Sequence, residues 1–166
     1  SQFPNDPRYV RARDRQFLGG ISAGGPATLH RMMPAFPRQC PPIVIAQHIS
    51  DGFVSGMVSW LRTLSRVELK MAVQGEYLRP GTAYLCPSEN HMKIDRSKKI
   101  VFVARHADDL YRPSCDILLL SVAKSFGNKA VGVILTGMGN DCVAGITRIR
   151  EAGGWTIAQD ENTSVI

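Results

Sequence analysis

The sequence lacks long apolar segments, a secretion signal and any cysteine pattern of a metal or disulfide scaffold. No apolar run approaches the ~18 residues of a membrane-spanning helix, so membrane insertion is not expected. Residues 1–15 are polar and arginine-rich without the apolar core of a signal peptide, and we interpret them as a disordered leader or linker remnant. The cysteines, at positions 40, 86, 115 and 142, form no C-x-x-C pair. We expect buried thiols in a reducing compartment, the cytoplasm.

The sequence also lacks the glycine patterns that bind phosphate groups. Gly24 is followed by Gly25-Pro26 and no lysine, which excludes a P-loop. No glycine stands two residues after Gly19 or Gly20, which excludes the dinucleotide fingerprint. The net charge of +6 favours an acidic partner, but the basic residues are scattered and no aromatic side chains alternate with them. We therefore expect a protein partner and no nucleic acid.

The sequence does contain an alternation of short apolar strands and helices. Its 166 residues fit a single domain with a proper core. The predicted strands are 16–21, 43–47, 67–73, 82–86, 131–136 and 155–159, and the predicted helices are 26–33, 53–64, 114–126 and 141–152. Residues 91–94 and 99–103 predict an antiparallel hairpin. The pattern predicts a three-layer, doubly wound α/β fold with a mostly parallel sheet over residues 16–166. A trimmed C-terminus is expected, because no helix follows the last predicted strand.

Two predicted helices carry more detailed signals. In the helix over 53–64, apolar residues at helical spacing predict one buried face, formed by Phe53, Met57, Trp60, Leu61 and Leu64. In the helix over 114–126, Ser114 is the predicted N-cap and Gly127 the residue just past the end. These signals predict which side of the first helix faces the core and where the second helix begins and ends.

Three predicted strands end in residues that together could form a nucleophile, a base and an orienting acid. Ser22 lies in the sequence Gly20-Ile21-Ser22-Ala23-Gly24, a G-x-S-x-G nucleophile elbow. His48 follows the second strand, and Asp141 follows the glycine-rich loop after the strand over 131–136. Because the carboxyl ends of parallel strands share one edge of the sheet, these residues predict a catalytic triad.

Each triad residue also has a structural interpretation. Ser22 fits a helix N-cap, His48 an ordinary loop residue and Asp141 the N-cap of the following helix. Among the other histidines, His30 is expected to face solvent and His91 to be structural. The chain order Ser, His, Asp differs from the Ser, Asp/Glu, His order of α/β-hydrolases, so an ordinary α/β-hydrolase is not predicted.

The motifs as a set resemble the catalytic domain of the CheB-type chemotaxis protein-glutamate methylesterases. The resemblance covers about Phe17 to the end of the chain. It rests on Gly20-x-Ser22-x-Gly24-Gly25, Gln47-His48, Gly75-Glu76, Pro80-Gly81-x-x-Tyr84, Pro87, His91-Met92, Arg112-Pro113-Ser114-x-Asp116, Thr136-Gly137-Met138-Gly139-Asn140-Asp141 and Trp155-Thr156-Ile157-Ala158-Gln159.

The resemblance implies hydrolysis of glutamate methyl esters on chemoreceptors, with deamidation of receptor glutamines as a related activity. It implies Ser22, His48 and Asp141 as the triad and neither a metal nor an organic cofactor. Ala23, Met138, Gly139 and Arg112 are candidate oxyanion or substrate residues. The expected partners are methyl-accepting chemoreceptor proteins, with a methyltransferase or the family's receiver domain as further candidates.

The sequence departs from the family pattern after the triad aspartate, where Cys142 replaces the usual glycine. A Cβ there could shift the loop that carries Asp141 or narrow the cleft. Cys86 stands where a small residue such as alanine is common, and Ala23 where threonine is often found. A catalytically weak or silent homologue that binds receptors or a methyltransferase is therefore the alternative function.

Overall fold

The computed structural model describes residues 18–23, 26–135 and 139–160, with the backbone alone for residues 18–23. The larger elements in chain order are β1 (Leu18–Ala23), α1 (Pro26–Met32), β2 (Ile43–Gln47), α2 (Val54–Arg62), β3 (Glu68–Met71), β4 (Thr82–Leu85), β5 (Asn90–Ile94), β6 (Ile100–Ala104), α3 (Cys115–Phe126), β7 (Val131–Ile134), α4 (Val143–Glu151) and β8 (Trp155–Ala158). Short 3-10 turns, η2 (Met33–Ala35) and η3 (Gly127–Lys129), follow α1 and α3. Every strand and helix predicted from the sequence is present.

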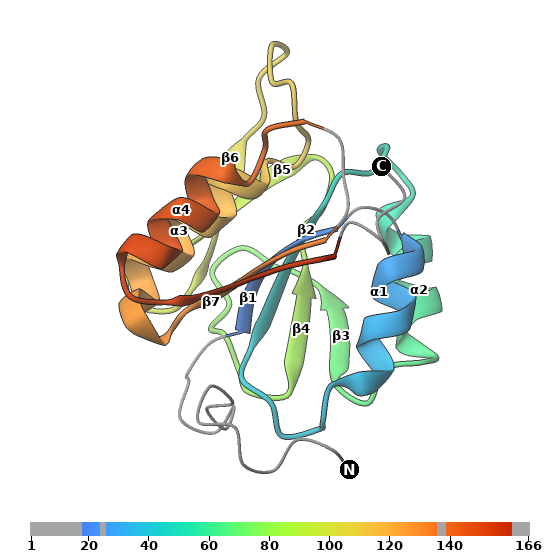
Figure 1. Ribbon diagram of the computed structural model, residues 1–166. Coiled ribbons are helices and arrows are strands. Elements are labelled where there is room, and N and C mark those ends of the chain that lie inside the picture. Colours follow the sequence, from blue (N-terminus) through green and yellow to red (C-terminus); the bar gives the residue numbers. More distant parts are fainter. Residues whose placement is uncertain (1–17, 24–25, 136–138, 161–166) are drawn as a thin grey trace.

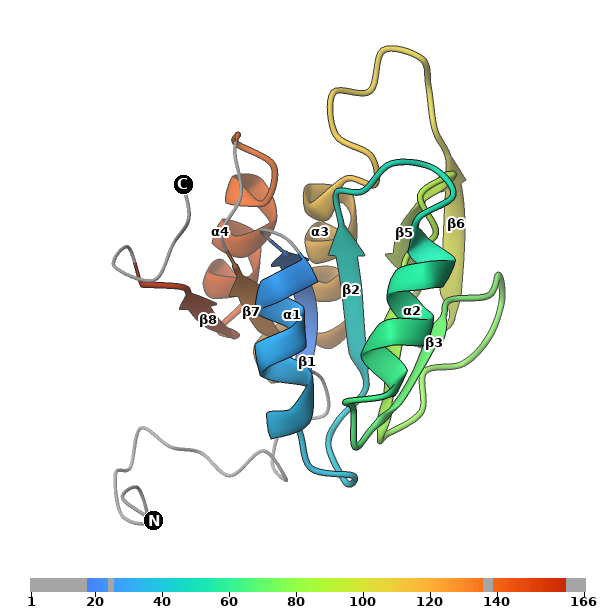
Figure 2. The same cartoon turned by 90° about the vertical axis from the view of Figure 1, so that its right-hand side faces the viewer.

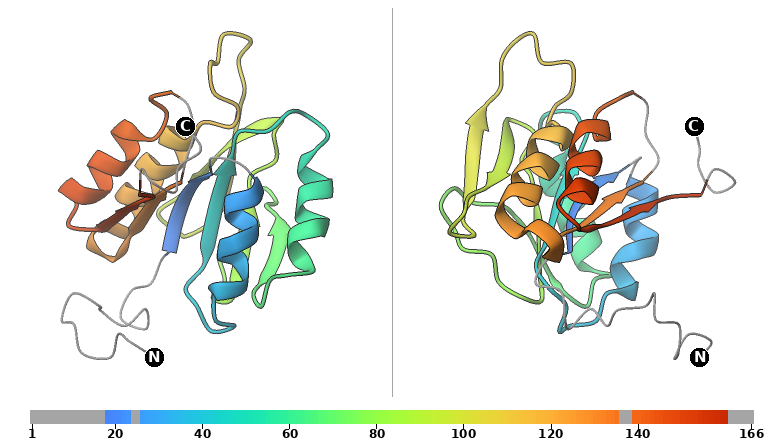
Figure 3. Two further views of the ribbon diagram at one scale, coloured as in Figure 1. Left: turned by 45° about the vertical axis from the view of Figure 1, so that its right-hand side comes forward. Right: turned by 60° about the vertical axis from the view of Figure 1, so that its left-hand side comes forward.

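A parallel sheet with the strand order β3-β4-β2-β1-β7-β8 forms the middle layer. Helices α1 and α2 cover one face, and α3 and α4 cover the other (Figures 1 and 2). Strands β5 and β6 form a separate antiparallel pair that packs beside α3 (Figure 3). The predicted three-layer, doubly wound α/β fold with an antiparallel hairpin is confirmed.

Strand β2 shows how the sheet divides the core into two layers. All of its residues are buried, as expected for a central parallel strand with helices on both faces. Ile43 and Ile45 pack with residues of α1 and α2, such as Leu29 and Leu61. Val44 and Ala46 pack instead with α3 and the hairpin, where Leu118, Val122 and Met92 are fully buried. The strand is held from both sides, which fixes the residue that follows it, His48.

The predicted buried face of α2 is partly wrong. Met57 and Leu61 are buried, but Phe53 precedes the helix and is 68% exposed, and Trp60 is 42% exposed. Val54 and Val58 complete the buried face instead, because they continue the three- and four-residue spacing of Met57 and Leu61. Trp60 lies outside this stripe and stacks on His30 of α1, with ring centroids 5.0 Å apart.

The start of α3 agrees with the sequence and the start of α4 does not. Ser114 is the N-cap of α3 and accepts a hydrogen bond from the Ile117 amide, and Gly127 ends the helix at a φ of 54°. Helix α4 begins at Val143, with Cys142 as its N-cap residue at a φ of 107°. Asp141 therefore lies outside α4. Its carboxylate is bound to a different helix.

None of the helices in the described parts of the chain has the length and hydrophobicity needed to cross a bilayer.

Candidate active site

The carboxyl ends of β1, β2 and β7 meet at the centre of the sheet. The backbone of Ser22 is in register with Ala46 of β2 on one side and Ile134 of β7 on the other. After β1 the chain builds β2, β3 and β4 on one side and later places β7 and β8 on the other. This reversal creates the crevice in which open α/β sheets bind their ligands.

His48 and Asp141 form a direct pair at this crevice. The Nε2 atom of His48 lies 2.8 Å from Oδ2 of Asp141, although 93 residues separate the two in sequence. The Asp141 side chain is 2% exposed, whereas that of His48 is 32% exposed. The acid is therefore enclosed in protein, and the imidazole beside it faces solvent, as a base that meets a substrate must.

The Asp141 carboxylate is bound by the N-terminus of α3. The amides of Cys115 and Asp116 donate to it at 2.6 and 2.8 Å, and the Ser114 hydroxyl donates at 3.0 Å. The first turn of a helix offers unpaired amides and a positive dipole end, which favour a carboxylate. Burial by itself would raise the pKa of Asp141. The hydrogen bonds from His48, both amides and Ser114 outweigh it and lower the pKa to about 2. Asp141 is therefore ionised at neutral pH.

Tyr111 connects the histidine to the loop before Asp141. Its ring stacks on the His48 ring with centroids 5.3 Å apart and 19° between the planes. Its hydroxyl accepts a hydrogen bond from the Asn140 amide at 3.0 Å. Gly139 has a φ of 96°, and a Cβ there would lie 2.2 Å from the Tyr111 hydroxyl. Glycine is thus required at position 139 by both its backbone conformation and the approach of the tyrosine.

The Cys115 thiol lies on the other side of the pair. Its Sγ is 3.6 Å from Nε2 of His48 and 3.5 Å from the carbonyl oxygen of Ala46. The ligand atoms of His48, Cys115 and Asp141 lie within 4.8 Å of one another, a set that a divalent metal ion can use. The carboxylate already accepts four hydrogen bonds, so the arrangement is accounted for by the protein alone.

A second histidine–aspartate pair braces the loop that carries Tyr111. His91 is buried, and its Nε2 lies 2.8 Å from Oδ2 of Asp109. Its Nδ1 accepts from the Ser114 amide at 2.9 Å, which makes Nε2 the protonated nitrogen. The amide of His106 also donates to Asp109, and both hydrogen bonds lower the pKa of Asp109, the His106 amide more strongly. The structural interpretation of His91 is confirmed.

Arg112 helps to form a cleft beside His48. Its guanidinium donates to the carbonyl oxygens of Asp109 and Ala107 within its own loop. A cavity of about 360 Å³ lies between the segment after β2 and this loop, and its lining includes His48, Leu110, Tyr111 and Arg112. Arg112 therefore lies on the wall of the cleft that opens at the histidine.

The structure brings most of the predicted site residues to one place. His48 and Arg112 line the cleft, Asp141 lies behind His48, and Gly139 lies against Tyr111. The Ser22 and Ala23 backbones lie at the end of β1. The side chains of Ser22 and Ala23 and the whole of Met138 lie outside the described residues. All four cysteines are buried thiols, as expected.

The site roles of Tyr111 and Cys115 and the pairing of His91 with Asp109 were not predicted from the sequence. The motif Arg112-Pro113-Ser114 was the available signal, because a specific motif beside a helix start marks a loop with a fixed role. This motif does not show which residues from distant parts of the chain contact the loop. The interpretation of Asp141 as a cap of its own helix is wrong, since it caps α3 instead.

Comparison with known proteins decides the family. A model of the CheB methylesterase family matches residues 18–166. The chain belongs to the CheB methylesterase family. The structure also resembles the crystal structure of the Thermotoga maritima CheB methylesterase catalytic domain, with a TM-score of 0.81 and 33% identity over 92% of this chain and 82% of that one.

The curated relatives of this CheB methylesterase domain are longer proteins. A protein-glutamate methylesterase/protein-glutamine glutaminase of Paramagnetospirillum magneticum is 52% identical over 89% of this chain, and that of Escherichia coli K12 is 41% identical over 89%. Protein-glutamate methylesterase FrzG of Myxococcus xanthus is 43% identical over 87%. The chain spans only 43–44% of the length of these relatives.

Proposed function

We propose that residues 16–166 form the catalytic domain of a protein-glutamate methylesterase, a serine hydrolase with Ser22 as nucleophile, His48 as base and Asp141 as orienting acid. The observation that carries the proposal is the buried, ionised Asp141 bound to a solvent-facing His48 at the end of β2. Ser22 is the last residue but one of the neighbouring strand β1, in register with the residue two positions before His48. A nucleophile and its base thus occupy adjacent strand ends.

The proton path follows from the contact between His48 and Asp141. In the neutral ring, Nε2–H donates to Asp141, so Nδ1 is the nitrogen that takes the Ser22 proton. The Ser22 oxygen attacks the ester carbonyl carbon, and the tetrahedral intermediate expels methoxide, which takes the proton from His48 and leaves as methanol. Water then attacks the glutamyl-serine ester, gives its proton through His48 to the Ser22 oxygen, and releases glutamate. With glutamine as substrate, ammonia leaves in the first step.

Asp141 supplies orientation and charge in this proposal. Its pKa of about 2 keeps it ionised throughout the cycle, so it stabilises the imidazolium that forms when His48 takes the proton. Tyr111 holds the ring from its open face. We assign Ala23, Met138 and Gly139 to the oxyanion site through their backbone N–H groups, and Arg112 to the wall that contacts the substrate.

The substrate class follows from the names of the relatives. Several are called protein-glutamate methylesterase/protein-glutamine glutaminase. We propose methyl-accepting chemoreceptor proteins as the substrates, the cytoplasm as the location, and a receiver domain or a methyltransferase as further partners. The net charge of +6 suits substrates rich in glutamate.

Methanol release from a methylated chemoreceptor tests the activity, with Ser22→Ala as the control variant. Loss of the nucleophile is expected to lower the rate by several orders of magnitude, because triad residues act as a unit. Equal release by both proteins would remove Ser22 as the nucleophile. Labelling of Ser22 by a fluorophosphonate checks the nucleophile without any receptor.

Cys142 is the observation that favours a second candidate function. In this second function the protein is a silent homologue that only binds receptors or a methyltransferase. This residue has a φ of 107°, a conformation that favours glycine, directly after Asp141. Its strain has not displaced the acid, since Asp141 keeps all four hydrogen bonds. Receptor binding without fluorophosphonate labelling would favour this second function.

A further inference from the structure

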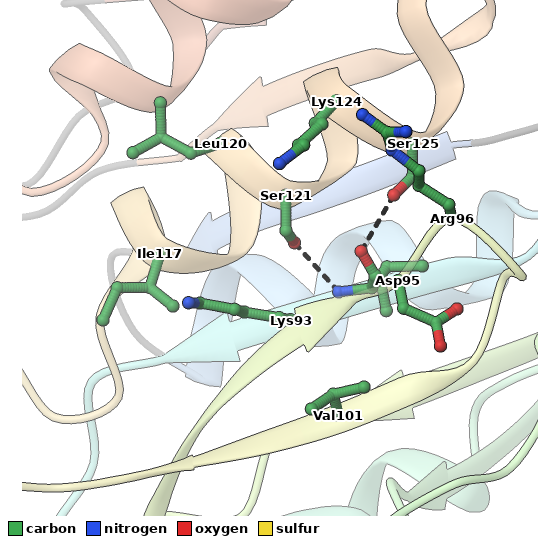
Figure 4. Close-up of a pocket in the computed structure, with 10 residues that line it drawn as sticks. Lys93, Asp95, Arg96, Val101, Ile117, Leu120, Ser121, Lys124 and Ser125 are labelled. Carbon is green, nitrogen blue, oxygen red and sulfur yellow. Dashed lines mark hydrogen bonds between the residues drawn. The ribbon is translucent and has the colours of Figure 1, made fainter.

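A second concave surface lies between the hairpin and α3, away from the catalytic pair. It is a cavity of about 560 Å³ lined by β5, the turn after it, β6 and the outer face of α3. Figure 4 shows Lys93 and Arg96 on the hairpin side, and Ile117, Leu120 and Lys124 on the helix side. We call it the hairpin pocket. Its volume falls in the range of about 300–1,000 Å³ typical of ligand sites.

Two serine hydrogen bonds hold the walls of the hairpin pocket in place. Ser121 accepts from the Ile94 amide at 2.9 Å, and Ser125 donates to the Ile94 carbonyl oxygen at 2.8 Å. Ser121 also donates to the Leu118 carbonyl oxygen within α3. The end of β5 is thereby fastened to the middle of the helix, so the pocket exists before anything binds to it.

The rim of the hairpin pocket carries positive charge without partners. Lys93, Arg96 and Lys124 are exposed, and none of them has an ion pair or hydrogen bond within the described part of the chain. The only acid on the lining, Asp95, already accepts a hydrogen bond from the Lys99 amide. Below the rim the lining is aliphatic, with Ile117 half-buried and Leu120 39% exposed. The complementary occupant carries carboxylates around an aliphatic side chain.

The lining argues against a nucleotide or a nucleic acid. No aromatic side chain lines the pocket, so a base would have no ring to stack on. The wall of α3 runs from Ile117 in its first turn to Ser125 near its end, and the first amides of the helix, the usual phosphate binders, are already bound to Asp141. An acidic amphipathic peptide segment satisfies both the cationic rim and the aliphatic floor.

We propose that the hairpin pocket is a docking site for an acidic amphipathic segment of the protein substrate; that the partner is the substrate rests on the proposed esterase function. Helix α3 connects the two sites, because the amides of Cys115 and Asp116 at its start bind Asp141 and its side chains from Ile117 onward line the pocket. At about 1.5 Å per residue, Lys124 lies roughly 13 Å along the axis from Cys115. One extended or helical segment spans this distance, so docking at the pocket presents a neighbouring residue to His48.

The direct test measures binding without catalysis. The probe is a synthetic, fluorescein-labelled helical peptide with glutamates on its polar face and leucines on its apolar face, followed by fluorescence anisotropy. The double variant Lys93→Ala/Lys124→Ala is expected to weaken binding about tenfold, as two charge contacts would. The control Arg66→Ala/Arg150→Ala removes the same charge at exposed sites elsewhere and is expected to weaken it less than about twofold. Leu120→Asp places a charge on the floor and is expected to weaken it as much as the double lysine variant.

Two results in this assay would overturn the proposal. Equal loss of affinity in the lysine variant and the arginine control would show that only net charge matters. Tighter binding of a single-stranded oligonucleotide than of the peptide, with the same dependence on Lys93 and Lys124, would assign the pocket to nucleic acid.

A second measurement separates this proposal from the proposed function. Lys93→Ala/Lys124→Ala is expected to raise KM for a methylated chemoreceptor about tenfold, with kcat and the rate of fluorophosphonate labelling unchanged. An unchanged KM would show that the segment bound by the pocket does not belong to the substrate. Absence of labelling in the wild-type protein would overturn the esterase function while leaving the peptide-binding result intact.

Discussion

At the scale of single residues, the site depends on Asp141 more than on any other described side chain. It connects His48 to the first turn of α3 through four hydrogen bonds to its two oxygens. It accepts from every one of these donors only while it is ionised. An asparagine at this position has the same shape as the aspartate, but its amide presents N–H groups to some of these donors. The shape of the side chain is therefore kept while hydrogen bonds to it are lost.

Asp141→Asn is therefore expected to lower the rate of methanol release roughly a thousandfold or more, because His48 loses its orienting acid and the tautomer it imposes. Circular dichroism checks that the variant is folded. Asp108→Asn, in an exposed acid of the nearby loop, serves as the control and is expected to stay within about twofold of the wild type. Retention of more than a tenth of the activity by Asp141→Asn would argue against a working triad.

Tyr111 offers a finer test, because its ring and its hydroxyl make separate contacts. Tyr111→Phe keeps the stacking on His48 and loses the hydrogen bond from Asn140, so kcat is expected to fall by about two- to fivefold. Tyr111→Ala loses both and is expected to lower kcat by about ten- to a hundredfold. Tyr77→Ala, at a tyrosine 58% exposed on another loop, is the control. Equal activity of Tyr111→Ala and Tyr77→Ala would contradict a positioning role.

At the scale of elements, the packing of α3 against α4 explains how the loop that carries Asp141 is fixed. Gly145 of α4 lies against α3, where a Cβ would be 2.4 Å from the Leu119 Cβ. The Gly145 amide donates to the Asp116 carboxylate at 2.6 Å. The two helices approach closely only because this position has no side chain. Asp141 lies two residues before the start of α4 and is bound to α3, so the same contact sets the position of the acid.

A pair of helical glycines tests this packing. Gly145→Ala is expected to lower the free energy of unfolding by about 1–3 kcal/mol, since the methyl group forces the helices apart. Gly56→Ala, in α2, has nothing within 4 Å of the added Cβ and is expected to raise it by about 0.5–1 kcal/mol. Urea denaturation monitored by circular dichroism measures both. A stabilised Gly145→Ala protein would show that α3 and α4 are not closely packed there.

The elements also show what the sequence could and could not predict. Strand β2 and the N-cap Ser114 were predicted correctly, because a continuous apolar run and a capping residue are local signals. The exposed Phe53 and Trp60 were misplaced, since periodicity alone does not locate the centre of the buried stripe. The site was predicted as far as residues at strand ends. Tyr111 and the binding of Asp141 to α3 escaped prediction because both contacts depend on how distant segments pack.

At the scale of the whole molecule, the doubly wound sheet gathers chemistry from distant parts of the chain. Residues from the ends of β1 and β2 and from the loop after β7 converge because parallel strands all present their carboxyl ends at one edge. The buried carboxylate that this arrangement creates also contributes to folding. Its pKa is about 2 in the folded protein, against about 3.9 for an exposed aspartate.

The stability of the protein should therefore depend on pH through Asp141. Because the folded pKa lies below the unfolded one, the contribution is complete above about pH 4 and is lost as the pH falls towards 2. A comparison with Asp141→Asn isolates the contribution of this single group. Between pH 5 and pH 2, the wild type is expected to lose about 2 kcal/mol more free energy of unfolding than the variant. Asp51 and Asp109, whose pKa values are also lowered, are present in both proteins and cancel in the difference. Urea denaturation at each pH measures it, and parallel pH profiles for the two proteins would mean that the hydrogen bonds to Asp141 do not stabilise its ionised form.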